Sequence, residues 1–387
     1  SGRPLKTTPI YTDLLATGAV MGQVYGWERP LWFAPNGEQD EPSFERPNWW
    51  QQVGEEARAL ASACGLSEMS TYATFCVEGH DAEAFLDFIG SARCPSAPGK
   101  VGLTLMLNAR GGMVGDLTVE NCGDGQFYCV GATLAVARYQ RWLQQHADGF
   151  GVCITDTTDE TAILGIAGPR SRRLLNALSQ GAFDDFPFMT SKTVEIGRVR
   201  CKAIRVSYSG ELGWELHCPM ANQKALFDTL MAKGQHHGLI LVGSRAMGML
   251  RLEKGYRSWG AEMSTEITPH AAGLERFCSQ HKDFLGRAAV VAERNAPPAQ
   301  RLATLAVDTA APPCWGTEPV LHGDELVGYV TSGGMGWRVD TLLAVAWLDA
   351  AYANPGTELS VQILQRAFRA TVVADPVYDP GDQRLKG

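Results

Sequence analysis

The chain has 387 residues, of which 45% are hydrophobic, and its formal net charge at pH 7 is −8. This length supplies a large core and suggests two or three domains. The negative charge argues against a nucleic-acid partner, which needs a clustered basic face, and no apolar run reaches the roughly 18 residues of a membrane-spanning helix. The N-terminus lacks the features of a signal or transit peptide. We therefore expect a cytoplasmic protein, or one of the mitochondrial matrix if the source is eukaryotic.

Cysteine, histidine and glycine patterns exclude several kinds of site. The ten cysteines are scattered, form no Cys-x-x-Cys pair and stand mostly in apolar runs, as expected for small buried residues in a reducing compartment. The histidines lack metal-ligand spacing, so we predict no metal site. The glycine patterns that bind dinucleotides or triphosphates are missing, and we therefore expect no FAD in this chain.

The N-terminal segment mixes helices with irregular chain. A short helix is expected to begin at Pro9 and to stop at Gly18. Residues 25–33 are aromatic and interrupted by proline, which predicts no regular element but a hydrophobic clip that packs the N-terminus onto the body. After a polar loop at 34–48, apolar residues recur at helical spacing from 49 to 64, and Gly65 is expected to cap that helix.

The next segment predicts a small α+β unit. Gly111 and Gly112 form a tight turn between two apolar runs, which indicates a β-hairpin. Asp116 follows this turn among apolar neighbours. Its carboxylate either faces a cavity or caps local backbone N–H groups. The remaining elements indicate a subdomain of split β-α-β type; they are strands at 70–78 and 126–130 and helices at 80–89 and 134–146.

The second half contains a further mixed region and then a strand-rich one. The mixed region is expected to contain strands at 152–155, 161–165 and 239–242, alternating strands and turns at 193–218, and helices at 169–178, 224–233 and 245–255. Arg251 stands in an apolar setting within the last helix. Beyond the boundary at Pro297 and Pro298, short strands separated by Gly and Pro predict an antiparallel barrel-like domain; they lie at 302–307, 325–331, 342–348, 358–363 and 366–373.

Six stretches together resemble the glycine-cleavage T-protein (aminomethyltransferase) family in order and spacing. They are residues 8–11, 109–119, 210–216, 249–255, 282–287 and 330–334. Residues 25–33 and 254–260 look more like the folate-binding C-terminal half of dimethylglycine and sarcosine dehydrogenases and oxidases. In those enzymes an FAD domain oxidises the amine. The resemblance therefore implies either an excised half or a subunit that works with a separate FAD-dependent amine oxidase or dehydrogenase.

The resemblance also implies the architecture. The family fold is α+β and consists of three domains arranged as a cloverleaf around a central channel that holds folate. We expect a discontinuous folate-binding domain at 1–68 plus 156–276, an α+β domain carrying Asp116 at 69–155, and the C-terminal barrel at 277–387.

The resemblance assigns roles to individual residues. Asp116 matches the catalytic carboxylate near the reacting folate nitrogens, with Thr118 lining the site on the same strand. Tyr208 looks like the pocket tyrosine, with a catalytic and a binding role. Glu215 matches the carboxylate that pairs with the aminopyrimidine edge of the pterin. The remaining two cofactor-binding residues are Arg251, which orders the site, and Trp259.

The chemistry of these side chains suits the roles. A carboxylate such as that of Glu215 accepts two adjacent N–H groups of a planar pterin at once. A carboxylate in the place of Asp116 takes a proton, holds the amine and stabilises a cationic iminium. From the residues alone, each has an ordinary structural alternative. Glu215 could form a salt bridge at a strand edge, Arg251 could pair with Glu253 or with a helix C-terminus, and Tyr208 and Trp259 could be core packing.

Two departures narrow the function. The free T-protein usually has two aspartates after the glycines, but the first position here is Gly115. Residues 66–72 lack the family's Ser-His-Met, which argues against a role with a lipoyl carrier. We expect tetrahydrofolate-dependent capture of an iminium or formaldehyde carbon from an N-methyl amine, giving 5,10-methylenetetrahydrofolate. The alternatives are a non-catalytic folate-binding or docking module of a flavoprotein complex and a direct folate-dependent demethylase.

Overall fold

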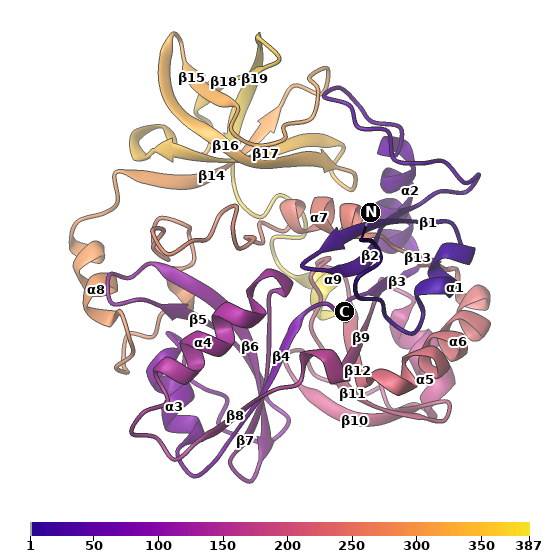
Figure 1. Cartoon of the computed structure of the whole chain (residues 1–387). Coiled ribbons are helices and arrows are strands. Elements are labelled where there is room, and N and C mark those ends of the chain that lie inside the picture. The colour runs from indigo at the N-terminus through magenta and orange to yellow at the C-terminus, as the bar shows by residue number, and fades with distance from the viewer. Residues whose placement is uncertain (1) are drawn as a thin grey trace.

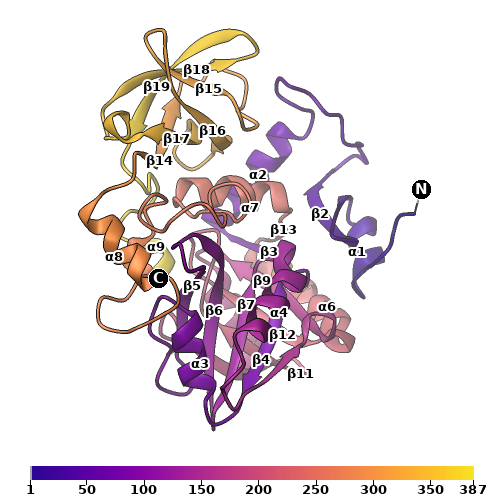
Figure 2. The ribbon, with the colours of Figure 1, turned by 60° about the vertical axis from the view of Figure 1, so that its left-hand side comes forward.

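The computed structural model describes residues 2–387. Two β-sheets and a closed β-barrel surround the middle of the molecule, where helix α7 (Ser244–Glu253) and the loop after it lie (Figure 1). Seen from the second direction, α7 again lies between the barrel and the two sheets (Figure 2). The predicted α+β fold with a C-terminal antiparallel barrel is confirmed.

A five-stranded antiparallel sheet carries Asp116. Its order is β5-β6-β7-β4-β8, and its strands are β4 (Ala73–Glu78), β5 (Val101–Leu107), β6 (Met113–Gly123), β7 (Gln126–Gly131) and β8 (Cys153–Asp156). Helices α3 (Ala82–Ile89) and α4 (Val136–Gln145) share a core with one face of the sheet. The unit β7-α4-β8 is a split β-α-β, because β4 lies between two mutually parallel strands.

A six-stranded sheet of order β10-β11-β12-β9-β3-β13 lies beside it. Its strands are β3 (Cys64–Glu68), β9 (Thr161–Ala167), β10 (Ser191–Ile196), β11 (Val199–Ile204), β12 (Gly213–Pro219) and β13 (Leu239–Leu241). Helices α5 (Ser171–Ser179) and α6 (Gln223–Gly234) pack against one face. Only the β13–β3 pair of this sheet is parallel within the described residues.

The C-terminal barrel closes in the order β14-β17-β16-β15-β18-β19. Its strands are β14 (Gln300–Val307), β15 (Pro319–His322), β16 (Glu325–Gly336), β17 (Thr341–Asp349), β18 (Glu358–Ile363) and β19 (Arg366–Val373). The sequence did not predict β15, which is short and begins at a proline, nor α8 (Arg287–Asn295) before the barrel. The chain ends with α9 (Gln383–Lys386).

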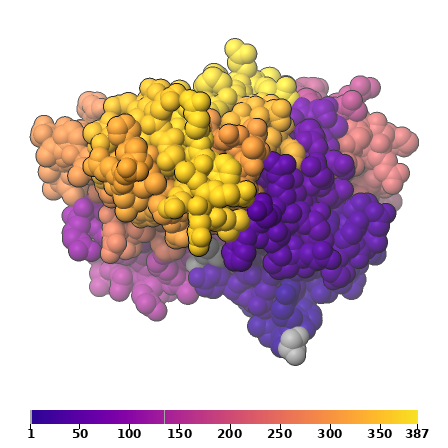
Figure 3. All heavy atoms as spheres, turned by 90° about the horizontal axis from the view of Figure 1, so that it is seen from above, coloured from indigo at the N-terminus to yellow at the C-terminus, as the bar shows by residue number. Residues whose placement is uncertain are grey.

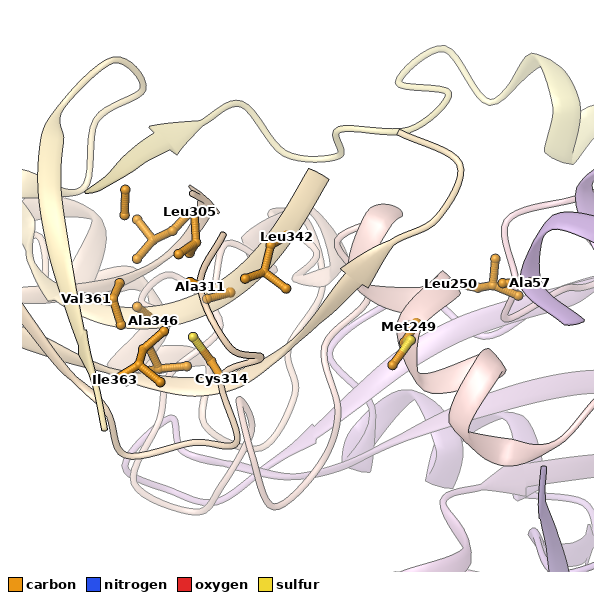
Figure 4. Packing of buried hydrophobic residues seen from close by; sticks show 14 of the residues in the cluster. Ala57, Met249, Leu250, Leu305, Ala311, Cys314, Leu342, Ala346, Val361 and Ile363 are labelled. Atoms are coloured by element: carbon orange, nitrogen blue, oxygen red, sulfur yellow. The ribbon is translucent and has the colours of Figure 1, made fainter. Parts of the chain in front are cut away.

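The barrel interior is continuous with the packing of the helices beside it. Barrel residues such as Leu305 and Leu342 belong to the same buried cluster as Leu250 of α7 and Ala57 of α2 (Trp50–Ser62) (Figure 4). From above, the barrel lies directly against the N-terminal segment (Figure 3). The barrel therefore buttresses α7, which leads into the centre of the molecule.

The prediction of an irregular clip at residues 25–33 was wrong. Residues 27–33 form the regular strand β2 (Trp27–Phe33), which pairs with β1 (Ala19–Val24) and follows the short helix α1 (Tyr11–Ala16). Tyr25 and Gly26 make the hairpin turn with positive φ values. Pro30 is tolerated because it lies at a register shift of a two-stranded hairpin, where a missing N–H costs little.

The predicted helix at 49–64 is shorter than expected. Helix α2 ends at Ser62, and Gly65 does not cap it but lies within strand β3. A Cβ atom on Gly65 would lie 2.6 Å from Cγ2 of Val242, so the glycine allows close packing inside the sheet. The short 3₁₀ turns are η1 (Thr133–Ala135), η2 (Thr158–Glu160), η3 (Met220–Asn222), η4 (Gln235–His237), η5 (Glu275–Phe277) and η6 (Ala350–Tyr352).

All ten cysteines are free thiols, and seven of them are buried, whereas Cys122 and Cys153 are exposed and Cys76 is half-buried. Among residues 2–387, no helix has both the length and the apolar character needed to cross a membrane. The domain boundaries expected from the sequence stay a prediction.

Candidate functional site

Strand β6 presents Asp116 and Thr118 on one face. Side chains two residues apart on a strand point the same way, and the intervening Leu117 and Val119 are buried on the opposite face with α3 and α4. The Asp116 backbone N–H donates to the hydroxyl of Tyr139, at 3.1 Å. Gly115 must be small, since a Cβ there would lie 2.2 Å from that hydroxyl. The backbone at Asp116 is thus held from the helix side, while the carboxylate faces the other way.

The Asp116 carboxylate is half-buried and forms no hydrogen bond or ion pair with another residue within the part of the chain that the structure describes. Burial raises its pKa above the ordinary value, and a local backbone N–H partly offsets this effect. A carboxylate in this setting binds a proton more readily than one in water. It is therefore suited to accept a proton from a bound molecule, and no protein cation competes for it.

Glu215 lies on β12, in the six-stranded sheet. Its neighbours Trp214 and Leu216 are buried in the core of that sheet, so Glu215 points from the opposite face. Glu215 and Tyr208 line the same cavity, together with Met69. Oε2 of the Glu215 carboxylate lies 3.3 Å from Nε2 of His217. Oε1 has no hydrogen-bond partner among the described residues.

Tyr208 follows β11 and stacks on Tyr256, with ring centroids 5.9 Å apart and planes inclined by 27°. Burial raises the pKa of Tyr208 to about 12; the Arg251 guanidinium opposes this, and the carboxylate charges of Asp116 and Glu262 add to it. The tyrosine therefore stays a neutral hydrogen-bonding group at neutral pH.

Arg251 is buried near the end of α7 and does not pair with Glu253, which instead pairs with Arg338. Its partner is Glu262, at 2.9 Å. Arg251 also donates to the carbonyl oxygen of Tyr256, at 3.0 Å, and to the hydroxyl of Ser332, at 3.1 Å. The sequence-based alternative of an Arg251–Glu253 pair is therefore wrong.

Glu262 is the centre of this cluster and was not predicted. It is fully buried, and its two carboxylate oxygens accept hydrogen bonds from four donors in three parts of the chain. The donors are the Arg251 guanidinium, the Ser258 backbone N–H at 2.8 Å, and the hydroxyls of Thr331 and Ser332. Thr331 and Ser332 belong to barrel strand β16. The cluster thus fastens the loop 254–263 to both α7 and the barrel.

Trp259 lies on this loop, next to Ser258. The guanidinium carbon of Arg138, on α4, lies 3.2 Å from the centre of the Trp259 ring. Neither the indole N–H of Trp259 nor two guanidinium nitrogens of Arg138 have partners among the described residues. This contact joins the loop to the helix that also supplies Tyr139.

Tyr208 and Glu215 thus share one cavity, and the charges of Asp116 and Arg251 act on Tyr208. Thr118 lies farther along β6, and Trp259 contacts Arg138 of α4. The sequence analysis did not single out Tyr72, which precedes β4. Burial raises its pKa, and the charges of Tyr208 and Glu215 contribute in the same direction. A lone tyrosine in a turn carries no recognisable motif, so the sequence offered no signal for it.

The comparisons with known proteins agree with the fold. The model of the GCVT N-terminal domain matches residues 10–282, and that of the glycine cleavage T-protein C-terminal barrel domain matches residues 300–379. The aminomethyltransferase T of the glycine cleavage system from Bartonella henselae has the same fold, with a TM-score of 0.86, 23% identity, and 97% of this chain and 98% of that chain covered.

Two curated relatives extend the match. Mitochondrial dimethylglycine dehydrogenase of Rattus norvegicus is 34% identical over 401 positions, which cover all of this chain and 46% of that protein. Aminomethyltransferase of Moorella thermoacetica is 30% identical over 378 positions, covering 97% of this chain and 98% of that protein.

Fold and matches together define a domain arrangement of the aminomethyltransferase type. The chain belongs to the glycine-cleavage T-protein family of folate-dependent one-carbon transfer proteins, which confirms the predicted resemblance. It spans about half the length of the dehydrogenase relatives that it matches.

Proposed function

We propose that this protein transfers a one-carbon unit to tetrahydrofolate, capturing the iminium or formaldehyde carbon of an N-methyl amine such as dimethylglycine or sarcosine and yielding 5,10-methylenetetrahydrofolate. The observation that carries the proposal is a half-buried Asp116 carboxylate whose charge acts on Tyr208, the residue that shares a cavity with the Glu215 carboxylate. The similarity to dimethylglycine dehydrogenase supports the choice of amine.

The side chains present fit a tetrahydropterin. Glu215 offers a carboxylate with one oxygen free of protein partners, which suits the adjacent N–H donors of an aminopyrimidine ring. Tyr208 and Tyr256 offer stacked aromatic surface beside it. Tetrahydrofolate, when bound, supplies the nitrogen atoms that take up the carbon.

The residues of the chain then have distinct roles. Asp116 accepts a proton and stabilises positive charge on the one-carbon donor, which its raised pKa and lack of a protein cation favour. Glu215 binds the pterin edge, Tyr208 contributes a neutral hydroxyl, and Thr118 lines the site. Arg251 orders the loop that carries Trp259, through the contacts with Glu262.

A source of oxidised amine is also part of the proposal. The chain contains no glycine fingerprint for FAD, and the dehydrogenases that it resembles are about twice as long. We therefore propose that an FAD-dependent amine dehydrogenase or oxidase, as a separate subunit or as another part of the same protein, supplies the carbon. The proposed compartment is the cytoplasm, or the matrix in a mitochondrion.

The test is calorimetric titration of tetrahydrofolate into the wild type, Asp116→Asn and Glu215→Gln, followed by the rate of condensation with formaldehyde. Glu215→Gln replaces one acceptor by a donor, and we expect its affinity to fall about tenfold to a hundredfold, the size of a charge-assisted hydrogen bond. Asp116→Asn should bind normally and lose about 10²–10⁴ in rate.

The other outcomes identify the alternatives. Normal binding without any rate enhancement that depends on Asp116 indicates a binding or docking module. Formation of 5-methyltetrahydrofolate from a methylated amine indicates a direct demethylase. Absence of tetrahydrofolate binding by the wild type refutes the proposal.

A further inference from the structure

The carboxylate of Glu215 is the end of a chain of three hydrogen-bonded side chains. Its Oε2 lies 3.3 Å from Nε2 of His217, and Nδ1 of His217 lies 3.0 Å from the hydroxyl of Tyr128. Glu215 and His217 stand two residues apart on β12 and so face the same way. Tyr128 comes from β7, 89 residues earlier in the chain. The contacts therefore cross from the five-stranded to the six-stranded sheet.

The chemistry of the groups sets the direction of these hydrogen bonds. An ionised carboxylate only accepts, so Nε2–H of His217 donates to Glu215. The other nitrogen of a neutral imidazole then accepts, and the Tyr128 hydroxyl donates to it. The tyrosine thereby selects the tautomer that has its proton on the side of Glu215.

The imidazole has little freedom to move. The side chain of His217 is only 3% exposed, and its ring meets that of Tyr128 edge to face, with centroids 5.5 Å apart at 88°. Rotation of the imidazole would break both hydrogen bonds. The ring is therefore a fixed support beside the Glu215 carboxylate.

The neighbouring charges leave this arrangement intact. Lys202 stands opposite His217 on β11, and its Nζ lies 4.5 Å from the centre of the Tyr128 ring. That ammonium group is already paired with Glu120, at 2.6 Å. Lys202 therefore holds the tyrosine ring in place through a cation–π contact, while Glu215 is the carboxylate that His217 contacts.

We propose that His217, held by Tyr128, is a positioning residue that orients the Glu215 carboxylate for recognition of the aminopyrimidine edge of tetrahydrofolate. This inference rests on the proposed function and deepens it. A carboxylate offers about four acceptor positions, so Oε2 can accept from His217 and still leave acceptor positions of Glu215 free for a ligand. Glu215 lines the cavity that it shares with Tyr208. A carboxylate oriented in advance loses less conformational freedom on binding.

Three substitutions separate positioning from simple packing. His217→Leu removes the donor, His217→Gln keeps an amide donor and an acceptor, and Tyr128→Phe removes one hydroxyl. We expect His217→Leu to weaken tetrahydrofolate binding about tenfold, the size of the loss when one hydrogen bond to a charged group is removed. Tyr128→Phe should weaken it less, and His217→Gln should restore most of the affinity. Thermal unfolding of each variant establishes that it is folded.

The decisive comparison repeats His217→Leu in the Glu215→Gln background. Positioning predicts that the second substitution then has little further effect on tetrahydrofolate affinity. The same loss in both backgrounds overturns the inference, as does unchanged affinity of His217→Leu in the otherwise native chain. If the wild type itself binds no tetrahydrofolate, the proposed function fails and this inference fails with it; wild-type binding with an unaffected His217→Leu variant refutes the inference alone.

Discussion

Replacing Glu262 by glutamine tests how the loop 254–263 is held at the centre of the molecule. The amide of glutamine has nearly the shape of the carboxylate. Its oxygen can still accept from Arg251 and from the Ser258 N–H, and its NH₂ group can donate to the hydroxyls of Thr331 and Ser332, because hydroxyls also accept. The hydrogen bonds are thus largely retained, and the change removes a single negative charge.

The magnitude follows from burial. The side chain of Arg251 is 9% exposed and that of Glu262 is 0% exposed, so the arginine is left as an uncompensated buried cation. Breaking a buried pair in this way costs about 3–5 kcal/mol. For 387 residues the unfolding entropy is about 0.8 kcal/mol/K, so the Tm should fall by about 4–6 °C. Since the loop carries Tyr256 and Trp259, tetrahydrofolate affinity should fall too.

The assay is thermal unfolding followed by circular dichroism, with tetrahydrofolate titration on the same samples. Glu266→Gln is the matched control, because Glu266 is exposed on the segment that follows, and its Tm should be unchanged. Adding Arg251→Met to Glu262→Gln removes the orphaned cation and should recover part of the loss. A Tm for Glu262→Gln equal to that of the Glu266→Gln control would refute the argument that charge pairing holds this loop.

Three further predictions concern Asp116, its neighbour Gly115 and the buried carboxylic acid Glu56. Asp116→Asn should raise the Tm at pH 7 while slowing condensation. Burial raises the pKa of Asp116, so the wild type loses stability as pH rises through the interval between the unfolded and folded pKa values of this group. The Tm difference between the variant and the wild type should therefore vanish in acid. Gly115→Ala should cost about 1–3 kcal/mol, because its methyl group meets the Tyr139 hydroxyl, and adding Tyr139→Phe should relieve part of this loss in urea unfolding. Burial raises the pKa of Glu56 to about 7, although two backbone N–H donors act in the opposite direction. Ionisation of this group should therefore lower the stability by about 3 kcal/mol as pH rises from about 4.5 to 7. Glu56→Gln should remove that part of the dependence of Tm on pH, and an unchanged dependence would contradict this prediction.

The local patterns of the sequence determined much of the fold. Two glycines between apolar runs predicted the hairpin of β5 and β6, and strand alternation accounts for the common face of Asp116 and Thr118. The barrel was evident from short strands separated by turn residues. These features depend on neighbours in the sequence, where steric and burial preferences act directly. The same reasoning failed at Pro30, because a proline argues against a strand unless it lies at an irregularity of the pairing, and the register shift here is visible only in the structure.

Only the tertiary structure decided which distant side chains meet. Arg251 contacts Ser332, 81 residues away, and not its neighbour Glu253, while His217 meets Tyr128 from another sheet. His217 was within reach of sequence reasoning as a residue on the same strand face as Glu215, but its partner was not. Such pairs arise where separate elements pack against one another, helix α7 on the barrel in one case and one sheet on another in the other. The free energy of burying a polar group selects them only once the chain has folded. The sequence thus determined the strands that carry the candidate site, and the packing of sheets, helix α7 and barrel determined how its side chains are held.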